Sequence, residues 1–162
     1  MQGLRVPVYC SNDVNTPQVS GIFSPKILVP RSWRNLSEEQ QQTILTHELG
    51  HIKQRDPYIT LLQTVAIIVH FYNPLVWILN HRMNYYSEMA CDDYAIAARG
   101  MSRSDYLENL LSAVGDHQNA RGSLIPIWSF SDTFDKLKSR FQYQIEIADQ
   151  IRRQFGGSHL HL

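Results

Sequence analysis

The sequence HELGH at residues 47–51 constrains the fold of this 162-residue chain more than any other feature. Two histidines four positions apart lie on one face of an α-helix, one turn apart. The flanking residues also favour a helix, because Ser37 and Gln40 match a capping box and two acidic residues follow Ser37. The sequence therefore predicts a helix over about residues 38–54 that presents both imidazoles on the same side.

Two aligned imidazoles with a carboxylate beside them are typical of a zinc site that activates water. His47 and His51 would bind the metal, and Glu48 would reach a water molecule without binding the metal itself. The chain contains seven histidines, and a chance match to HExxH in such a chain is on the order of a one-in-a-hundred event. The HExxH motif alone does not establish a zinc site, so the sequence must also provide a third metal ligand.

A catalytic zinc ion takes three protein ligands and keeps one position open. Glu88 and Asp92 lie four residues apart on a second predicted helix and share one of its faces. Glu88 is the predicted third ligand, and Asp92 the carboxylate that accepts the free N–H of a ligating histidine. The alternative is an ordinary solvated pair of acids. The favoured interpretation is one Zn²⁺ per chain.

The rest of the chain predicts an α+β fold in a single domain, residues 1–162. Alternating β-branched residues and turn signals predict a small N-terminal sheet, followed by a mainly helical part. The predicted regions are a β-rich part (5–30), a helical part (37–155) and a flexible tail (156–162). The predicted strands are 5–9, 18–23 and 26–29, and the predicted helices are 38–54, 56–71, 74–99, 102–115 and 132–155.

The segment from Tyr58 to Leu79 contains no Asp, Glu, Lys or Arg and approaches the length of a membrane span. Pro57 and Pro74 bracket a piece that is too short to cross hydrocarbon as one straight helix. We therefore expect a buried core helix here, with Trp77 in the core. A face that rests on a membrane is the less favoured alternative.

Charge and cysteine content exclude several classes of protein. Lys plus Arg and Asp plus Glu both number 15, so no long-range field would attract nucleic acid. Cys10 and Cys91 belong to no CxxC pair, and the N-terminus has no secretory pattern. These features predict a cytoplasmic protein with no nucleic-acid partner. They do not indicate an oligomeric state.

Several motifs together resemble the peptidase domain of the β-lactam sensor-transducers, also called antirepressor-regulating membrane metallopeptidases. The likeness covers roughly residues 5–100. It implies a gluzincin-like fold, with zinc bound by His47, His51 and Glu88, and with Asp92 supporting a histidine. Family members usually embed this domain between transmembrane helices, so the chain resembles either a solitary minigluzincin or part of a larger membrane protein. The motifs are TPQVSGIFSPKILVP (16–30), HELGH (47–51), KQRDP (53–57), NPLVW (73–77) and SEMACDD (87–93).

These observations predict a zinc endopeptidase that acts on a peptide or protein. Glu48 would take a proton from water and pass it to the leaving amine. The edge strand of the predicted N-terminal sheet would face the active-site cleft and bind an extended substrate. Two alternatives stay open: a zinc-stabilised or latent module that does not cleave, and the cytosolic catalytic part of a membrane sensor. The predicted substrate-binding residues are Val19, Ser20, Gly21, Ile22 and Phe23.

Overall fold

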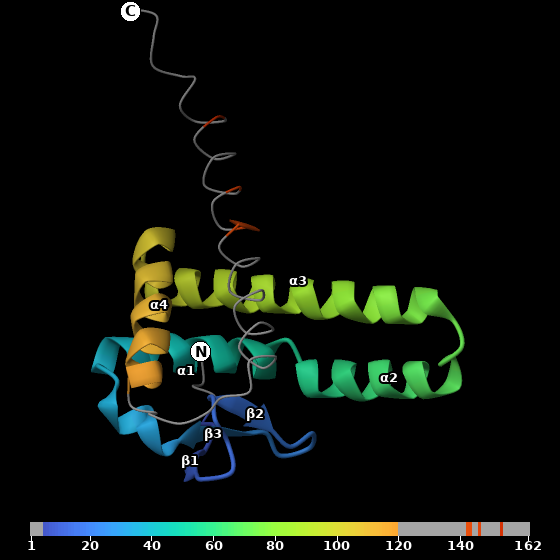
Figure 1. Ribbon diagram of the computed structural model, residues 1–162, viewed down its shortest axis with the longest axis horizontal. Helices are drawn as coiled ribbons and strands as arrows, with labels where there is room; N and C mark the ends of the chain where they lie inside the picture. Colours follow the sequence, from blue (N-terminus) through green and yellow to red (C-terminus); the bar gives the residue numbers. More distant parts are fainter. Residues whose placement is uncertain (1–4, 120–141, 144–145, 147–152, 154–162) are drawn as a thin grey trace, which may run out of the picture.

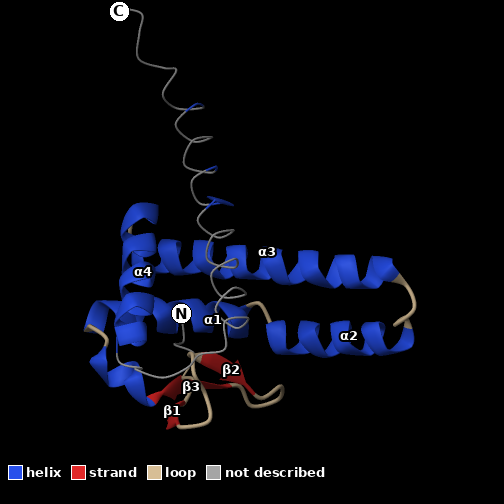
Figure 2. Ribbon diagram, viewed as in Figure 1, coloured by secondary structure: helices blue, strands red, loops and turns tan. Residues whose placement is uncertain are grey.

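The computed structural model describes residues 5–119, 142–143, 146 and 153. The predicted helix over 132–155 lies mostly outside the described residues, and the predicted tail over 156–162 lies wholly outside them. Within the described part, four α-helices follow a small three-stranded sheet (Figures 1 and 2). This arrangement confirms the α+β prediction.

The sheet has the order β1-β3-β2, so β3 is central and β2 is an edge strand. β1 pairs with β3 in parallel and β2 pairs with it antiparallel, with Val19 opposite Ile27. Ile27 and Val29 of β3 point into the core and are almost fully buried. The strands are β1 (Val8–Ser11), β2 (Gln18–Ser20) and β3 (Lys26–Pro30).

The predicted bounds of the first two strands are wrong, and the first strand ends at Ser11 rather than Tyr9. The first strand begins at Val8 rather than Arg5, and the second ends at Ser20 rather than Phe23. Gly21 ends the second strand because its φ of 93° is left-handed, and a Cβ there would lie 2.8 Å from the Ser24 carbonyl oxygen. The residues after Gly21 therefore belong to the turn into β3.

The helix boundaries follow the capping signals of the sequence closely, except that the fourth helix continues past its predicted end at Gly115 to Asn119. Ser37 Oγ accepts a hydrogen bond from the Gln40 amide, and Gln40 Oε1 accepts one from the Ser37 amide. Asn73 Oδ1 caps the third helix, which ends at a left-handed Gly100. The 3₁₀ helix η1 was not predicted. The elements are η1 (Arg31–Asn35), α1 (Glu38–Lys53), α2 (Asp56–Val69), α3 (Pro74–Arg99) and α4 (Arg103–Asn119).

The helix α1 lies between the sheet and α3 (Figure 1). Gly50 allows α1 and α3 to approach closely, because a Cβ at this position would lie only 3.2 Å from Cys91 Sγ and from Tyr94 Cδ1. Cys91 lines this contact, and both Cys91 and Ala95 of α3 are fully buried. The absence of a side chain at Gly50 thus brings the HELGH segment against the helix that carries Glu88.

The prediction that residues 58–79 form a buried core helix is wrong. α2 and the first turns of α3 form an arm that extends away from the sheet and α4 (Figure 1), and Gln63 is the buried residue of α2. Trp77, expected in the core, is 52% exposed. Among the described residues, none of the helices combines the length and apolar character needed to span a bilayer. Large apolar side chains exposed on this arm are Leu61, Leu62, Val65, Ile68, Val69, Phe71, Tyr72, Leu75, Trp77, Ile78 and Leu79.

Candidate metal centre

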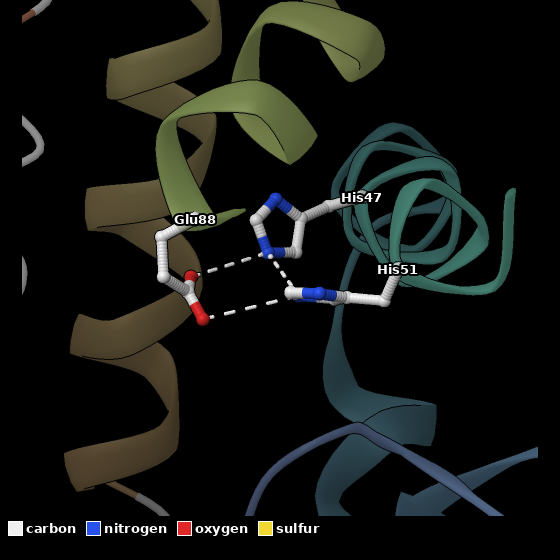
Figure 3. Close-up of side chains that lie close together, drawn as sticks. All are labelled: His47, His51 and Glu88. Atoms are coloured by element: carbon white, nitrogen blue, oxygen red, sulfur yellow. Dashed lines mark hydrogen bonds and ion pairs between the residues drawn. The ribbon is translucent and has the colours of Figure 1, made fainter. Parts of the chain in front are cut away.

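His47, His51 and Glu88 converge where α1 meets α3 (Figure 3). The two Nε2 atoms lie 3.2 Å apart. Glu88 Oε2 lies 3.6 Å from His47 Nε2, and Glu88 Oε1 lies 3.9 Å from His51 Nε2. The structure therefore brings together three side chains that the sequence singled out as ligands, although they lie up to 41 positions apart in the chain.

The donor set fits a divalent ion such as zinc. Metal–ligand bonds of about 2.0–2.2 Å in a tetrahedron place neighbouring ligand atoms roughly 3.3–3.6 Å apart, close to the separations of 3.2, 3.6 and 3.9 Å found here. Two Nε2 lone pairs and a carboxylate that face one another repel unless a cation lies between them. Neutral imidazoles and a carboxylate are ordinary zinc ligands.

Asp92 lies where a carboxylate supporting His47 is needed. Its Oδ1 is 3.0 Å from His47 Nδ1, so the imidazole donates its Nδ1–H and turns Nε2 toward Glu88. Tyr106 of α4 donates its hydroxyl to the same carboxylate oxygen at 2.5 Å. Asp92 and Tyr106 are both almost fully buried. A largely buried chain of tyrosine, carboxylate and histidine therefore fixes the orientation of His47.

His51 has an equivalent partner that the sequence analysis did not assign to the site. Asp56 Oδ2 lies 2.6 Å from His51 Nδ1 and accepts a second hydrogen bond from Ser87 Oγ at 2.5 Å. The position of Asp56 five residues after His51, just before a proline, was the available signal. Tyr106 gave no signal at all.

Glu48 lies on α1 between the two histidines and is 8% exposed. It is not part of the His47–His51–Glu88 group, which agrees with a role other than metal binding. Glu88 keeps 39% of its side-chain surface exposed, whereas His47 keeps 9% and His51 18%. The centre is thus open to solvent on the side of Glu88.

Cys91 lies behind His51 rather than in the centre. Its Sγ is 3.3 Å from His51 Nδ1 and accepts a hydrogen bond from Gln54 Nε2. Burial raises the pKa of this thiol, and the nearby carboxylates, Asp56 foremost, raise it further. Cys91 therefore stays a neutral thiol that packs α1 against α3.

A cavity of about 410 Å³ adjoins the centre and lies between the end of α1, α2 and α3. His51 and Glu88 are among the residues that line it. The buried Gln63 also lines the cavity and donates a hydrogen bond to Asn84 Oδ1. This cavity has the volume to hold a side chain of a bound peptide. Ile59, Thr60, Met83 and Tyr86 also line it.

The predicted substrate strand is only partly a strand. Val19 and Ser20 belong to the edge strand β2, which contacts α1. Gly21, Ile22 and Phe23 lie in the following turn, and Phe23 is 89% exposed. Substrate binding by these five residues stays a prediction.

Comparison with known proteins agrees with the resemblance noted in the sequence. The family described as BlaR1 peptidase M56 matches residues 3–143. The regulatory protein BlaR1 of Bacillus licheniformis is 27% identical over 128 residues, which are 78% of this chain and 21% of that protein. The methicillin resistance mecR1 proteins of Staphylococcus aureus and Staphylococcus epidermidis are 25% identical over 89 residues, 54% of this chain and 15% of theirs. The chain thus spans about a fifth or less of the length of these relatives.

Proposed function

Because this chain belongs to the BlaR1 peptidase M56 family, we propose that it is a zinc-dependent endopeptidase. The observation that carries the proposal is the convergence of His47, His51 and Glu88 within reach of one ion. Two imidazoles and one carboxylate leave a fourth position open for solvent or substrate. The exposed face of Glu88 gives access to that position.

Zinc bound at this centre would lower the pKa of a water molecule and polarise the substrate carbonyl. Glu48 would accept the proton that this water loses and deliver it to the leaving nitrogen. Burial of Glu48 next to His47 holds it in one place. Asp92 and Asp56 keep each Nδ1 protonated, so both Nε2 lone pairs stay available for the metal.

The fold offers two features for holding a substrate. Among the described residues, β2 pairs with β3 alone, and we propose that an extended peptide pairs with its other side. The cavity beside His51 and Glu88 would take a neighbouring side chain. The partner is therefore a peptide or an extended segment of a protein, and the zinc content is one ion per chain.

Removal of the metal gives the direct test. Dialysis against a strong chelator is expected to stop cleavage of an unfolded protein such as reduced casein, measured by mass spectrometry of the released peptides. One equivalent of Zn²⁺ should restore it, because the ligands are already aligned. Metal-free protein that cleaves as fast as the zinc-loaded protein would refute the proposal.

A module that binds zinc without cleaving is the alternative. A purely structural zinc site usually closes its fourth position with protein, whereas Glu88 is 39% exposed here. Glu48 would also have no task in such a site. The loaded protein would then hold one zinc ion and release no peptide from any substrate, which separates the alternative from the peptidase.

The exposed arm favours contact with a lipid surface. Residues 57–81 contain no Asp, Glu, Lys or Arg, and exposed apolar side chains occur on both helices of the arm. Phe71, Tyr72 and Trp77 lie around its turn, and such aromatic residues favour the membrane interface. We therefore propose that the arm rests on a membrane through its uncharged surface.

Flotation with uncharged phosphatidylcholine vesicles tests this contact. The triple variant Leu62→Gln, Ile68→Gln, Phe71→Gln should bind the vesicles at least about 100-fold more weakly. Each of the three side chains contributes roughly 1.5 kcal/mol or more when buried. A control with Val8→Gln and Leu111→Gln, exposed elsewhere, should float like the parent. Equal flotation of the triple variant and the parent would contradict a lipid contact.

A further inference from the structure

We propose that Asp56, held by Ser87, is the positioning residue of His51, so that one carboxylate ties both α2 and α3 to a metal ligand. This inference rests on the metal centre of the proposed function. It assigns Asp56 and Ser87 a role in metal affinity that is separate from binding the ion.

The imidazole of His51 donates a hydrogen bond through Nδ1 to one of its neighbours. Two groups lie near this nitrogen: Asp56 Oδ2 at 2.6 Å and Cys91 Sγ at 3.3 Å. A carboxylate oxygen is the stronger acceptor and also the closer one. His51 therefore donates Nδ1–H to Asp56, which leaves its Nε2 lone pair directed toward Glu88 and His47.

The fold in turn fixes Asp56 itself. Arg55 adopts a left-handed conformation, with φ of 61°, and turns the chain sharply between α1 and α2. Asp56 then becomes the first residue of α2, where free amides and the helix dipole stabilise a negative charge. Its side chain is only 14% exposed, so solvent competes weakly for its hydrogen bonds.

Ser87 also holds Asp56. This residue precedes Glu88 on α3, and its hydroxyl donates to Asp56 Oδ2 at 2.5 Å. One helix thus provides both a ligand of the ion and the donor that orients the support of another ligand. Any shift of α3 relative to the start of α2 would disturb Glu88 and His51 together.

The two histidines have the same kind of support behind their Nδ1 atoms. His47 has a carboxylate on Nδ1, Asp92, which accepts from the Tyr106 hydroxyl. His51 has Asp56, which accepts from the Ser87 hydroxyl. The same order of hydroxyl, carboxylate and imidazole occurs twice, built from different helices. Such repetition indicates that Asp56 is part of the metal centre and more than a link between helices.

The test measures zinc affinity by competition with a chromophoric chelator, using the whole chain. Partners of this kind typically change metal affinity by about 10–100-fold. Asp56→Asn keeps an acceptor but loses the charge, so its Kd for Zn²⁺ should rise about 10-fold. Ser87→Ala should raise it by a smaller factor, and Ser87→Thr, which retains the hydroxyl, should restore the parental value.

Two controls separate positioning from general effects. Asp93→Asn removes a negative charge from α3 that pairs with Arg103 at 2.8 Å, so it measures the effect of net charge on cation binding. Thermal unfolding of the metal-free variants measures stability. The visible spectrum of the Co²⁺-loaded protein reports ligand geometry directly, and Asp56→Asn should change its band positions while Asp93→Asn should not.

The outcomes are distinct. If Asp56→Asn and Ser87→Ala bind Zn²⁺ like the parent, with unchanged Co²⁺ spectra, the positioning role is refuted and the zinc site itself stands. The role is again refuted if the zinc affinity of Asp56→Asn falls only in proportion to its metal-free stability. It is also refuted if Asp93→Asn loses as much zinc affinity as Asp56→Asn. If His51→Ala also binds zinc normally, the proposed function fails as well.

Discussion

Replacement of Glu48 with glutamine is expected to abolish peptide cleavage while zinc stays bound. Glutamine has nearly the same shape but cannot accept a proton from water at neutral pH. A general base contributes typically 10²–10⁴-fold to the rate, so kcat should fall by about that factor. Glu48 lies outside the His47–His51–Glu88 group, so metal content, measured by mass spectrometry of the native protein, should stay at one equivalent.

Thermal unfolding separates loss of the base from misfolding, because Glu48 is 8% exposed and burial disfavours a charged group. The neutral amide should therefore leave the thermal unfolding midpoint unchanged or higher. Glu39→Gln, an exposed position on the same helix, serves as the matched control and should cleave normally. Undiminished turnover in Glu48→Gln would remove Glu48 from the mechanism.

The three side chains proposed as ligands could be singled out from the sequence because their relation depends largely on local periodicity. A helix fixes the relation of His47 to His51, and capping signals at Ser37, Asn73 and Gly100 place the helices within a few residues. Only the meeting of Glu88 with the histidines required tertiary structure, and the close approach at Gly50 supplies it. The motif thus carried most of the information about the centre.

The partners of the ligands could not be predicted in the same way. Asp56 reaches His51 through the left-handed turn at Arg55, a conformation that the local sequence gives little reason to expect in a non-glycine residue. Tyr106 reaches Asp92 because α4 packs on α1, and no spacing encodes that contact. The prediction of a buried helix for the uncharged arm is wrong for a related reason. Hydropathy of residues 58–79 indicates removal from water, but it does not say whether protein or another medium covers them.

Substitution of His51 by alanine is expected to remove the metal and its stabilising effect together. One lost ligand of three leaves His47 and Glu88, whose nearest atoms lie 3.6 Å apart, and two ligands hold zinc far more weakly. Metal content should fall from one equivalent to almost none. Ligand binding stabilises a fold by about 2.7 kcal/mol at a free concentration of 100 Kd, which raises the unfolding midpoint of a chain this size by roughly 5–10 °C.

That shift gives a readout independent of catalysis. The parent should unfold at a higher temperature with zinc than without it, and His51→Ala should show the same midpoint in both conditions. His70→Ala, an exposed histidine at the end of α2, should behave like the parent and excludes a general effect of losing an imidazole. Full zinc content in His51→Ala would mean that the ion lies elsewhere, since no geometry of His47 and Glu88 alone completes a closed site.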